Sequence, residues 1–495
     1  MKKHICVLMA AILLMSTLVS CGNAIQENET TESLQNGGIV TDRETQVTLV
    51  VPETRYDGEE LCFLTREDGN EWSTVEIFAE NQTASSDNIS TAVFERNDRI
   101  LQAYGVTVME LRQVTSQHGV TVTNEVYAPT GDILAVVSAS SECASLASKG
   151  YLWDLNSDDV EYMDFTKPWW DTNMAEDLSF NDKLYFATGD LLTTDNDATF
   201  VIMFNKQLVV DCGLPDLYAL VENNQWTMDR MYEFEQTAVQ DKNGDGILTY
   251  NSDVCGFAYT SDIPVALLVG GGVTLCTKDE DDYPIYGLNV ERAQNISEKG
   301  KLLFSKDYTV DMNNPGDGMG IVEVGRITFG EGHALFMGEV MQLVTRLRGY
   351  DVDFGILPYP MFNEQQDGYY SLMHYYASAS VAIPKSVQGD KLVMVNSIIE
   401  AMAYHSMDTL TEQYYEINLK TKGAKDEQSG PMIDKVLSGR VYDLSYYYMW
   451  GNTFSNIAGC LLPDSRKQIA SLHKSAQSSI KRAIEKMAEA MENFD

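Results

Sequence analysis

Residues 204–234 read FNKQLVVDCGLPDLYALVENNQWTMDRMYEF, and this stretch decides the fold. It follows an apolar run at residues 200–204 that has the length of a buried strand, so a strand leads directly into a helix. Gly213 and Pro215 then mark a turn. Thr227 stands where the N-cap of a second helix belongs, and that helix is predicted to end at Ala238. The stretch therefore has the strand-and-helix order of an α/β protein.

The part of the chain before this stretch repeats the same alternation. Three short apolar runs have the length of strands, at residues 61–64, 106–111 and 132–137. Such alternation with helical segments predicts parallel sheets, and ligands of these sheets bind at the carboxyl ends of the strands. The segment Ser138–Ser141 follows the third run as a predicted loop. We therefore expect Ser138 and Ser140 to contact a ligand.

The central stretch resembles the middle of the family 1 extracellular solute-binding proteins, the lipoprotein receptors of carbohydrate ABC importers. The pairs Asn205-Lys206, Gly213-Leu214 and Trp226-Thr227 carry this resemblance. Two further segments are also similar to that family, GHALFMG at residues 332–338 and FGILPYP at residues 354–360. The resemblance implies an α/β, two-lobe periplasmic-binding-protein-like fold of type II, whose lobes are joined by crossing hinge segments.

The resemblance and the composition together divide the chain into four parts. These are a lipoprotein signal peptide at 1–21, a flexible tether at 22–58, a first lobe at 59–198 plus about 350–404, and a second lobe at 199–349 plus about 405–495.

The amino terminus has the pattern of an export signal. Lys2 and Lys3 precede an apolar run at residues 5–15, which is too short to span a bilayer comfortably. Leu18-Val19-Ser20-Cys21 resembles a lipobox, in which Cys21 would be lipidated. An ordinary secretory signal with an incidental Cys21 is the alternative. We expect an exported protein at the cell surface, anchored to the cell membrane by an N-terminal lipid.

The charge of the chain narrows the classes of partner. Its 73 Asp and Glu residues against 35 Lys and Arg residues give a formal net charge of −38. Such a chain is not suited to bind nucleic acid or an anionic membrane surface. The chain also lacks the common hydrolase, metalloprotease and nucleotide-binding motifs, which indicates that it is not an enzyme. Carboxylate pairs are nevertheless numerous, so an exported carbohydrate-active hydrolase that uses such a pair remains the alternative.

Aromatic and acidic side chains are the candidates for solute contacts. Sugars bury flat C–H faces against aromatic rings, while their hydroxyl groups need acceptors nearby. The aromatic candidates are Trp170, Tyr259, Tyr375, Tyr448 and Trp450. The candidate hydroxyl acceptors are Asp190, Asp195 and Glu339. For the rings the alternative is packing in the core, and for the carboxylates it is a solvated loop.

Residues 241–249, DKNGDGILT, match the beginning of a calcium-binding loop. Asp241, Asn243 and Asp245 would supply side-chain oxygens, and Ile247 would supply its carbonyl. Position twelve is Ser252 instead of the usual Glu. This departure favours the alternative of a polar turn that solvates itself. Any Ca²⁺ would be structural, and no cofactor is required.

Taken together, the sequence predicts a solute receptor of an ABC importer. We expect a monomer that captures a small solute, a mono- or oligosaccharide, between its lobes and delivers it to a membrane permease. Hinge closure would bury the solute, because the solute contacts both lobes only in the closed state.

Overall fold

The computed structural model of the chain describes residues 48–67, 75–79, 88–415 and 428–492. The predicted signal peptide, Cys21 and most of the predicted tether lie outside these residues. Within these ranges, no helix combines the length and the apolar character that a membrane crossing requires.

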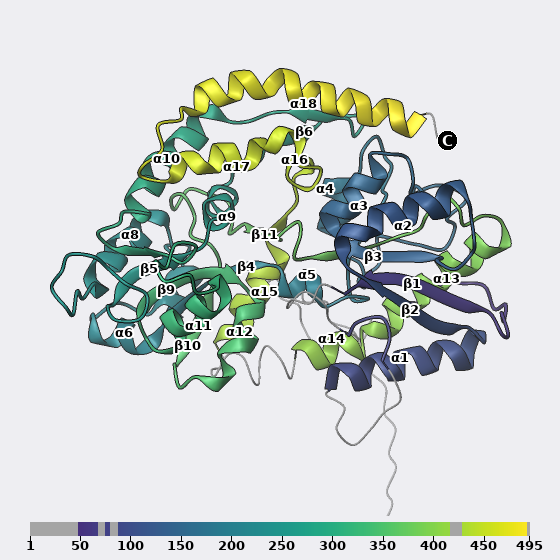
Figure 1. Cartoon of the computed structure of the whole chain (residues 1–495), viewed down its shortest axis with the longest axis horizontal. Helices are drawn as coiled ribbons and strands as arrows, with labels where there is room; N and C mark the ends of the chain where they lie inside the picture. Colours follow the sequence, from purple (N-terminus) through teal and green to yellow (C-terminus); the bar gives the residue numbers. More distant parts are fainter. Residues whose placement is uncertain (1–47, 68–74, 80–87, 416–427, 493–495) are drawn as a thin grey trace, which may run out of the picture. The chain divides into compact units, whose positions relative to one another are not determined.

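The first lobe is built on a four-stranded sheet with the order β12-β3-β1-β2 (Figure 1). Its strands are β1 (Glu60–Arg66), β2 (Thr107–Gln113), β3 (Ala135–Ala139) and β12 (Ala379–Ala382). Strand β1 pairs in parallel with both β2 and β3, whereas β12 pairs antiparallel to β3. The predicted parallel sheet is thus confirmed for three of its strands.

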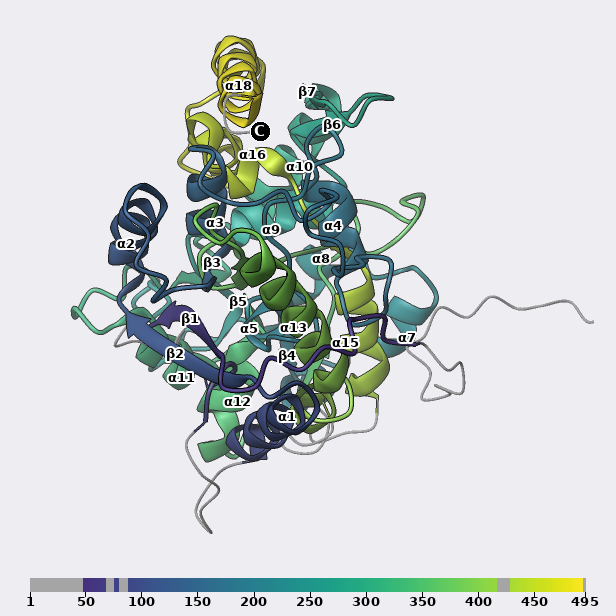
Figure 2. The same cartoon turned by 90° about the vertical axis from the view of Figure 1, so that its right-hand side faces the viewer.

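Helices cover both faces of this sheet. They are α1 (Asn88–Tyr104), α2 (Thr115–Tyr127), α3 (Ser140–Ala147), α4 (Thr172–Leu178), α13 (Asp390–Ser406) and α14 (Leu410–Glu412). Helix α13 packs against α1, and α2 packs against α3. The first pair lies on one side of the sheet and the second pair on the other (Figure 2).

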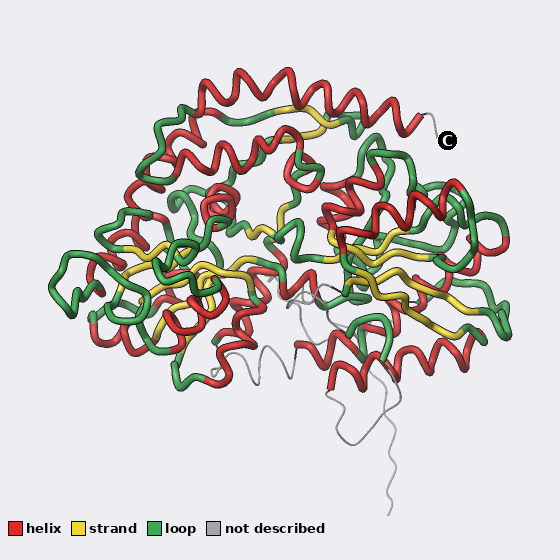
Figure 3. The backbone as a smooth tube through the Cα atoms, viewed as in Figure 1, coloured by secondary structure: helices red, strands yellow, loops and turns green. Residues whose placement is uncertain are grey.

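The second lobe is built on a five-stranded sheet with the order β10-β4-β9-β5-β8. Its strands are β4 (Phe200–Asn205), β5 (Cys255–Tyr259), β8 (Thr309–Asp311), β9 (Ala334–Val340) and β10 (Phe354–Leu357). Its helices are α6 (Lys206–Asp211), α7 (Leu217–Glu222), α8 (Met228–Ala238), α9 (Ile263–Gly270), α10 (Val290–Leu303), α11 (Ile321–Gly330), α12 (Gln342–Arg346) and α15 (Ser429–Ser438). The two sheets are the main groups of yellow strands on the left and the right of Figure 3.

Strand β4 is buried along its whole length, because the second sheet is covered on both faces. Ile202 and Phe204 point into one hydrophobic core, together with Trp226 of the central stretch. Val201 and Met203 alternate with them and point into another core. This two-sided burial explains why the sequence of β4 is a continuous apolar run instead of an alternating one.

The predicted turn and second helix after β4 are confirmed. Thr227 is the N-cap of α8, and its side chain accepts a hydrogen bond from the backbone N of Arg230 at 3.4 Å. The indole N–H of Trp226 donates to the carbonyl of Pro358 at 3.0 Å. The Trp-Thr pair therefore fixes the beginning of α8 against the segment that follows β10.

The chain passes between the lobes at three places. The first passage contains the short helix α5 (Thr194–Asp197), and the second runs from β10 to β12. The third lies between α14 and α15, because α14 packs on α1 whereas α15 packs on β10. A small sheet of β11 (Ser371–Leu372) and β13 (Arg440–Val441) joins the second passage to the chain that follows the third.

The predicted return to the first lobe at about residue 350 is wrong. Strand β10 pairs with β4 over four residues and so belongs to the second sheet. The chain rejoins the first sheet only at β12. The apolar sequence of β10 is suited to an edge strand of either sheet. Only its long-range pairing decides which sheet it joins.

The last part of the chain packs on the second lobe. It consists of α16 (Leu444–Tyr447), the 3-10 helix η3 (Trp450–Asn452), α17 (Thr453–Ala458), the 3-10 helix η4 (Gly459–Leu461) and α18 (Ile469–Glu492). Helix α18 packs on α10, on α17 and on a hairpin formed by β6 (Cys276–Lys278) and β7 (Pro284–Tyr286). Helix α18 has an apolar stripe on one face, where Ile480 and Met487 are buried.

A buried ion-pair cluster ties the passages together. One guanidinium nitrogen of Arg440 lies 3.1 Å from a carboxylate oxygen of Asp171, the N-cap of α4, and 3.1 Å from one of Asp195 in α5. Arg440 also donates to the side chain of Asn196. The hydroxyl of Tyr442 donates to Asp171 at 2.6 Å. The cluster thus connects a helix of the first lobe, the first passage and β13.

Replacing Arg440 by Leu is expected to destabilise the protein by about 3–5 kcal/mol, because two carboxylates would remain buried without their counter-charge. Urea unfolding at pH 7 measures this loss. Arg466→Leu is the matched control, since Arg466 is exposed, and it should change stability by less than about 0.5 kcal/mol. A loss of similar size in both variants would contradict the role assigned to Arg440.

Glu235 is another buried acid, and it forms no ion pair with any residue that the structure describes. Its side chain on α8 is fully buried, and neither carboxylate oxygen has a hydrogen-bond partner among the described residues. Burial raises the pKa of Glu235 well above its usual range. The folded chain therefore binds a proton that the unfolded chain releases above about pH 4.3, and this difference lowers stability as the pH rises.

The Glu235→Gln variant keeps the shape of the side chain and cannot ionise. At pH 7 it should unfold with a higher free energy than the natural chain, and the gain should shrink by about 1.4 kcal/mol per pH unit as the pH falls toward 4.3. Urea unfolding at pH 7, 6 and 5 measures this slope. Glu233→Gln, on the exposed side of the same helix, should show no such dependence. Equal stability of Glu235→Gln and the natural chain at every pH would refute the prediction.

Candidate functional site

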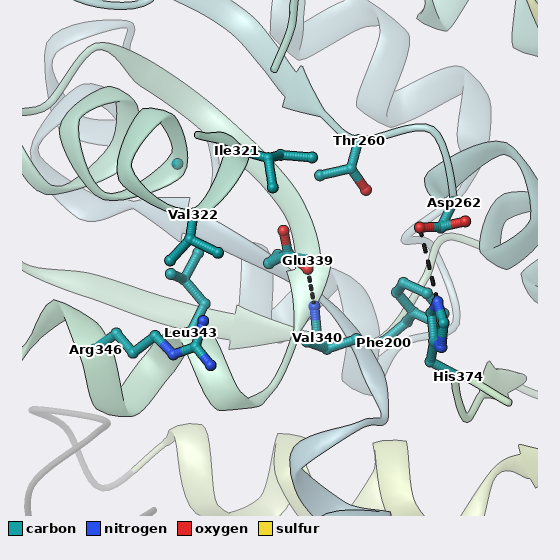
Figure 4. A pocket seen from close by; sticks show the side chains of 11 residues that line it. Phe200, Thr260, Asp262, Ile321, Val322, Glu339, Val340, Leu343, Arg346 and His374 are labelled. Carbon is teal, nitrogen blue, oxygen red and sulfur yellow. Dashed lines mark hydrogen bonds and ion pairs between the residues drawn. The ribbon is translucent and has the colours of Figure 1, made fainter. Parts of the chain in front are cut away.

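A cavity of about 260 Å³ lies in the second lobe, where β5 and β9 end. These strands are parallel neighbours, so their carboxyl ends lie at the same edge of the sheet. Its apolar lining consists of Phe200, Ile321, Val322, Val340 and Leu343, and its polar lining of Thr260, Asp262, Glu339, Arg346 and His374 (Figure 4). Apolar walls with a few converging polar groups are typical of small-molecule sites.

Local structure brings the polar side chains to this edge. Thr260 and Asp262 follow β5, and Asp262 is the N-cap residue of α9. Glu339 is the penultimate residue of β9, and Arg346 ends α12, which begins two residues after that strand. His374 comes from a different part of the chain, the second passage between β11 and β12. The cavity is thus lined by the second lobe together with a passage.

Glu339 turns one carboxylate oxygen toward its own strand and the other toward the cavity. Oε1 accepts a hydrogen bond from the backbone N of Val340 at 2.9 Å. Figure 4 shows the other oxygen on the side of Thr260 and Ile321. Burial raises the pKa of this carboxyl to about 7, the Val340 N–H opposes that rise, and the negative charge of Asp262 adds to it. Glu339 can therefore exist in either charge state near neutral pH.

His374 is held in one tautomer. Its Nδ1 accepts hydrogen bonds from the backbone N atoms of Tyr376 and Ala377, each at 3.1 Å. Because an acceptor nitrogen carries no proton, the neutral ring has its proton on Nε2. That nitrogen lies 3.7 Å from Oδ2 of Asp262. His374 thus presents an N–H to the Asp262 side of the cavity.

Aromatic rings support His374 from two sides. The ring of Tyr375 stacks on it with the centroids 4.9 Å apart, and Phe200 lies 5.7 Å away. Tyr376, the next residue but one, exposes 38 % of its surface. The guanidinium of Arg66 lies 5.1 Å from the centroid of the Tyr376 ring and holds it in place. An exposed, fixed aromatic ring therefore stands beside a residue that lines the cavity.

Comparison with solved structures identifies the architecture. An ABC substrate-binding protein from Listeria monocytogenes, in complex with cycloalternan, matches 87 % of this chain and 100 % of its own at 12 % identity, with a TM-score of 0.54. The sugar-binding protein MalE from Xanthomonas citri matches 88 % and 99 % at 11 % identity, also with 0.54. The maltose/maltodextrin-binding domain MalE from Bdellovibrio bacteriovorus, bound to maltotriose, matches 86 % and 100 % at 13 % identity, with 0.52. The chain has the fold of these proteins.

The two-lobe binding-protein fold predicted from the resemblance is therefore confirmed. By sequence, neither a protein-family model nor a curated protein matches the chain.

Of the ten predicted contact residues, Glu339 lines the cavity and Tyr375 supports it through His374. The structure does not bring the other eight to the cavity. These are Ser138, Ser140, Trp170, Asp190, Asp195, Tyr259, Tyr448 and Trp450.

The predicted loop at Ser138–Ser141 is wrong. Ser138 lies within β3 and Ser140 opens α3, and both are fully buried. The Ser138 hydroxyl lies 2.7 Å from Nδ1 of His118. The Ser140 hydroxyl lies 2.8 Å from those of both Ser378 and Ser380. These serines join elements of the first lobe, because a strand that leads directly into a helix leaves no exposed turn.

Several predicted rings follow the core-packing alternative. The indole N–H of Trp170 donates to Glu400 at 2.8 Å in the first lobe. Tyr448 and Trp450 stack on each other with their centroids 5.7 Å apart, and Trp450 is only 5 % exposed. Tyr259 is 7 % exposed and packs 4.7 Å from Phe304. Although Gly451 and Asn452 follow it, Trp450 does not lie in an open loop. It begins a 3-10 helix that packs against α18.

The two remaining predicted acids belong to the passages. Asp195 is buried in the ion pair with Arg440, and burial raises its pKa to about 6 against the opposing effect of that arginine. The backbone N of Asp190 donates to the carbonyl of Trp169 at 2.8 Å, and its carbonyl accepts from Thr411. They do not line the cavity.

Sequence reasoning missed Asp262 and His374. Asp262 follows an apolar strand directly, which is the signal that was applied to Ser138, so the same rule applied to residues 255–259 would have found it. His374 gives no local signal. It reaches the cavity only because the second passage runs past the end of β9.

The predicted calcium loop is a closed polar turn. Asp241 accepts hydrogen bonds from the backbone N atoms of Gly244 and Gly246 at 2.6 and 2.8 Å, and Asp245 accepts one from Ile247 at 2.8 Å. Asn243 accepts one from the backbone N of Asp245 at 2.9 Å. Among the residues that the structure describes, no group of three or more His, Cys, Asp or Glu residues could hold a metal ion. Calcium binding stays a prediction.

Replacing Asp262 by Asn should lower the pKa of Glu339 by on the order of one unit, because a neighbouring negative charge disappears. Infrared titration of the carboxyl band measures this pKa after subtraction of the spectrum of the Glu339→Gln variant. Glu364→Gln, a change at an exposed acid, is the control and should leave the pKa unchanged. An unchanged or higher pKa in Asp262→Asn would show that the two carboxyls do not interact.

Proposed function

We propose that the chain is an extracellular solute-binding protein that captures a carbohydrate and delivers it to an ABC permease. The observation that carries the proposal is the cavity at the carboxyl ends of β5 and β9, in a chain with the two-lobe binding-protein fold. Two of the similar structures hold oligosaccharides, cycloalternan and maltotriose.

The cavity has the groups that a sugar requires. Asp262 and Glu339 can accept hydrogen bonds from hydroxyl groups, and the Nε2–H of His374 can donate one. Tyr376 offers an exposed ring for a C–H face. The cavity lies in the second lobe and on a passage, so closure of the first lobe over it would complete the binding site.

The predicted partners follow from this role. A permease would receive the loaded protein, and a lipid on Cys21 would keep the protein at the outer face of the cell membrane. We expect it to act as a monomer. A carbohydrate-active hydrolase would also need two carboxyl groups, and Asp262 and Glu339 make it necessary to examine the recovered solute chemically.

Thermal and urea unfolding of the purified protein with a panel of mono- and oligosaccharides tests the proposal. The sugar that binds should raise the free energy of unfolding by roughly 2.7 kcal/mol at a hundredfold excess over its dissociation constant. Glu339→Ala and Asp262→Ala should each weaken its binding by about tenfold or more, whereas Glu364→Ala should not.

Three outcomes decide the matter. A stabilising sugar that is recovered intact supports the receptor, and one that is recovered as cleavage products assigns the cavity to a hydrolase. The absence of stabilisation by every sugar would reject carbohydrate as the solute. Repeating the series with Ca²⁺ or a chelator tests the loop at Asp241, which should add stability only if it binds the ion.

A further inference from the structure

Two acids, Glu339 and Asp262, line the cavity. Oε1 of Glu339 accepts a hydrogen bond from the Val340 N–H, and Oδ2 of Asp262 lies 3.7 Å from Nε2 of His374. Within the described part of the chain, neither carboxylate forms an ion pair with a lysine or an arginine. Asp171 and Asp195 differ in this respect, since they share Arg440.

Arg346 also lines the cavity, and it donates to Oε1 of Gln342 on its own helix. The negative charge of Asp262 raises the pKa of Glu339, whereas His374 and Arg346 lower it, and the effect of Asp262 is larger than that of either one.

A solute that enters a cavity of about 260 Å³ displaces the water around these acids. Loss of hydration is costly for a carboxylate unless a charged or strongly donating partner replaces the water. A neutral polyol returns hydroxyl donors but no positive charge. An ammonium group returns three N–H donors and a positive charge, and hydrogen bonds between ionised groups are the stronger kind.

The charge of the whole chain acts in the same direction. Its formal net charge of −38 produces a negative potential, which raises the local concentration of cationic solutes and lowers that of anionic ones. The negative potential of the protein thus favours the approach of cationic solutes, which is also the class of solute that the two acids of the cavity would stabilise once bound.

We propose that the solute carries a protonated amino group, as an amino sugar does, and that this group binds between Asp262 and Glu339. The proposal rests on the proposed function, because it assumes that a sugar enters this cavity. The neutral hydroxyls of the same solute would use His374 and Thr260, which line the cavity. Its C–H face would use the exposed ring of Tyr376, which is not part of the cavity lining but follows His374 by two residues. Glu339 and Asp262 then determine specificity for charge, while the aromatic ring does not.

The experiment compares matched solutes that differ only at one substituent. Glucosamine, glucose and N-acetylglucosamine, and the corresponding β-1,4-linked oligomers of each, are titrated calorimetrically into the purified protein at pH 7 and low salt. Spermidine serves as an amine without a sugar. We expect the amino form to bind at least about tenfold more tightly than the neutral forms, because one additional hydrogen bond between charged groups increases affinity by about that factor.

The variants locate the effect. Glu339→Gln and Asp262→Asn should each lower the affinity for the amino form by about tenfold and change that for the neutral forms by less than about threefold. Glu364→Gln should change neither. In the natural chain, added salt and a fall from pH 7.5 to 5.5 should weaken binding of the amino form alone, since Glu339 takes up a proton in that range. These two readouts need no variant to fold.

The outcomes separate this inference from the proposed function. Equal or tighter binding of a neutral form overturns the inference and leaves the carbohydrate receptor in place. Binding of spermidine without any sugar supports the amino-group site and overturns the carbohydrate assignment. Failure of every solute to bind rejects both.

Discussion

The arrangement of the lobes depends on one buried interaction, the pairing of Arg440 with Asp171 and Asp195. The three residues come from β13, from the N-cap of α4 and from α5, which are distant in sequence and meet where the chain passes between lobes. A buried charge is tolerated only when its partners are in place, so each carboxylate requires the arginine at this position. The cluster therefore fixes the path of the first passage.

That path determines where β4 begins, and the first residue of β4 forms part of the cavity wall. Phe200 is the first residue of β4 and lies five residues after Asp195. Its ring lines the cavity and contacts both His374 and Tyr359, the latter with its centroid 6.5 Å away. Because β4 runs antiparallel to β9, its beginning lies at the edge where β9 ends. The ion-pair cluster is thus connected by a few residues to the edge of the sheet where the cavity lies.

Local signals in the sequence account for most of the elements. The helix predicted to follow Thr227 is present and ends at Ala238 as predicted. Its bounds depend on capping and on periodicity, which act within one or two turns. The fold class follows from the order of such elements, and the resemblance to a family specified the arrangement further.

The site was harder to predict because its residues meet only through long-range pairing. Placement of β10 on the second sheet is decided by its pairing with β4, which lies about 150 residues earlier in the chain. His374 reaches the end of β9 only through the path of the second passage. Burial likewise decides which polar residues can contact a solute. Ser138 and Asp262 both come at or soon after the end of an apolar run, but Ser138 is fully buried whereas Asp262 lines the cavity. Composition gave no means to distinguish the acids in ion pairs from those in the cavity.

The two groups of acids illustrate opposite uses of the same chemistry. Asp171 and Asp195 are buried beside the positive charge of Arg440. This ion pairing offsets the cost of removing the two carboxylates from water, and no solute is needed for it. Asp262 and Glu339 line a cavity in which neither forms an ion pair with a lysine or an arginine among the described residues, and burial raises the pKa of Glu339 to about 7. A carboxyl with such a pKa can lose its proton when a cation binds beside it and keep the proton when none is present. The protein therefore need not hold two negative charges together in the empty cavity. The proposed selectivity for a cationic group would follow from that coupling, because a neutral solute brings no positive charge that favours ionisation of Glu339.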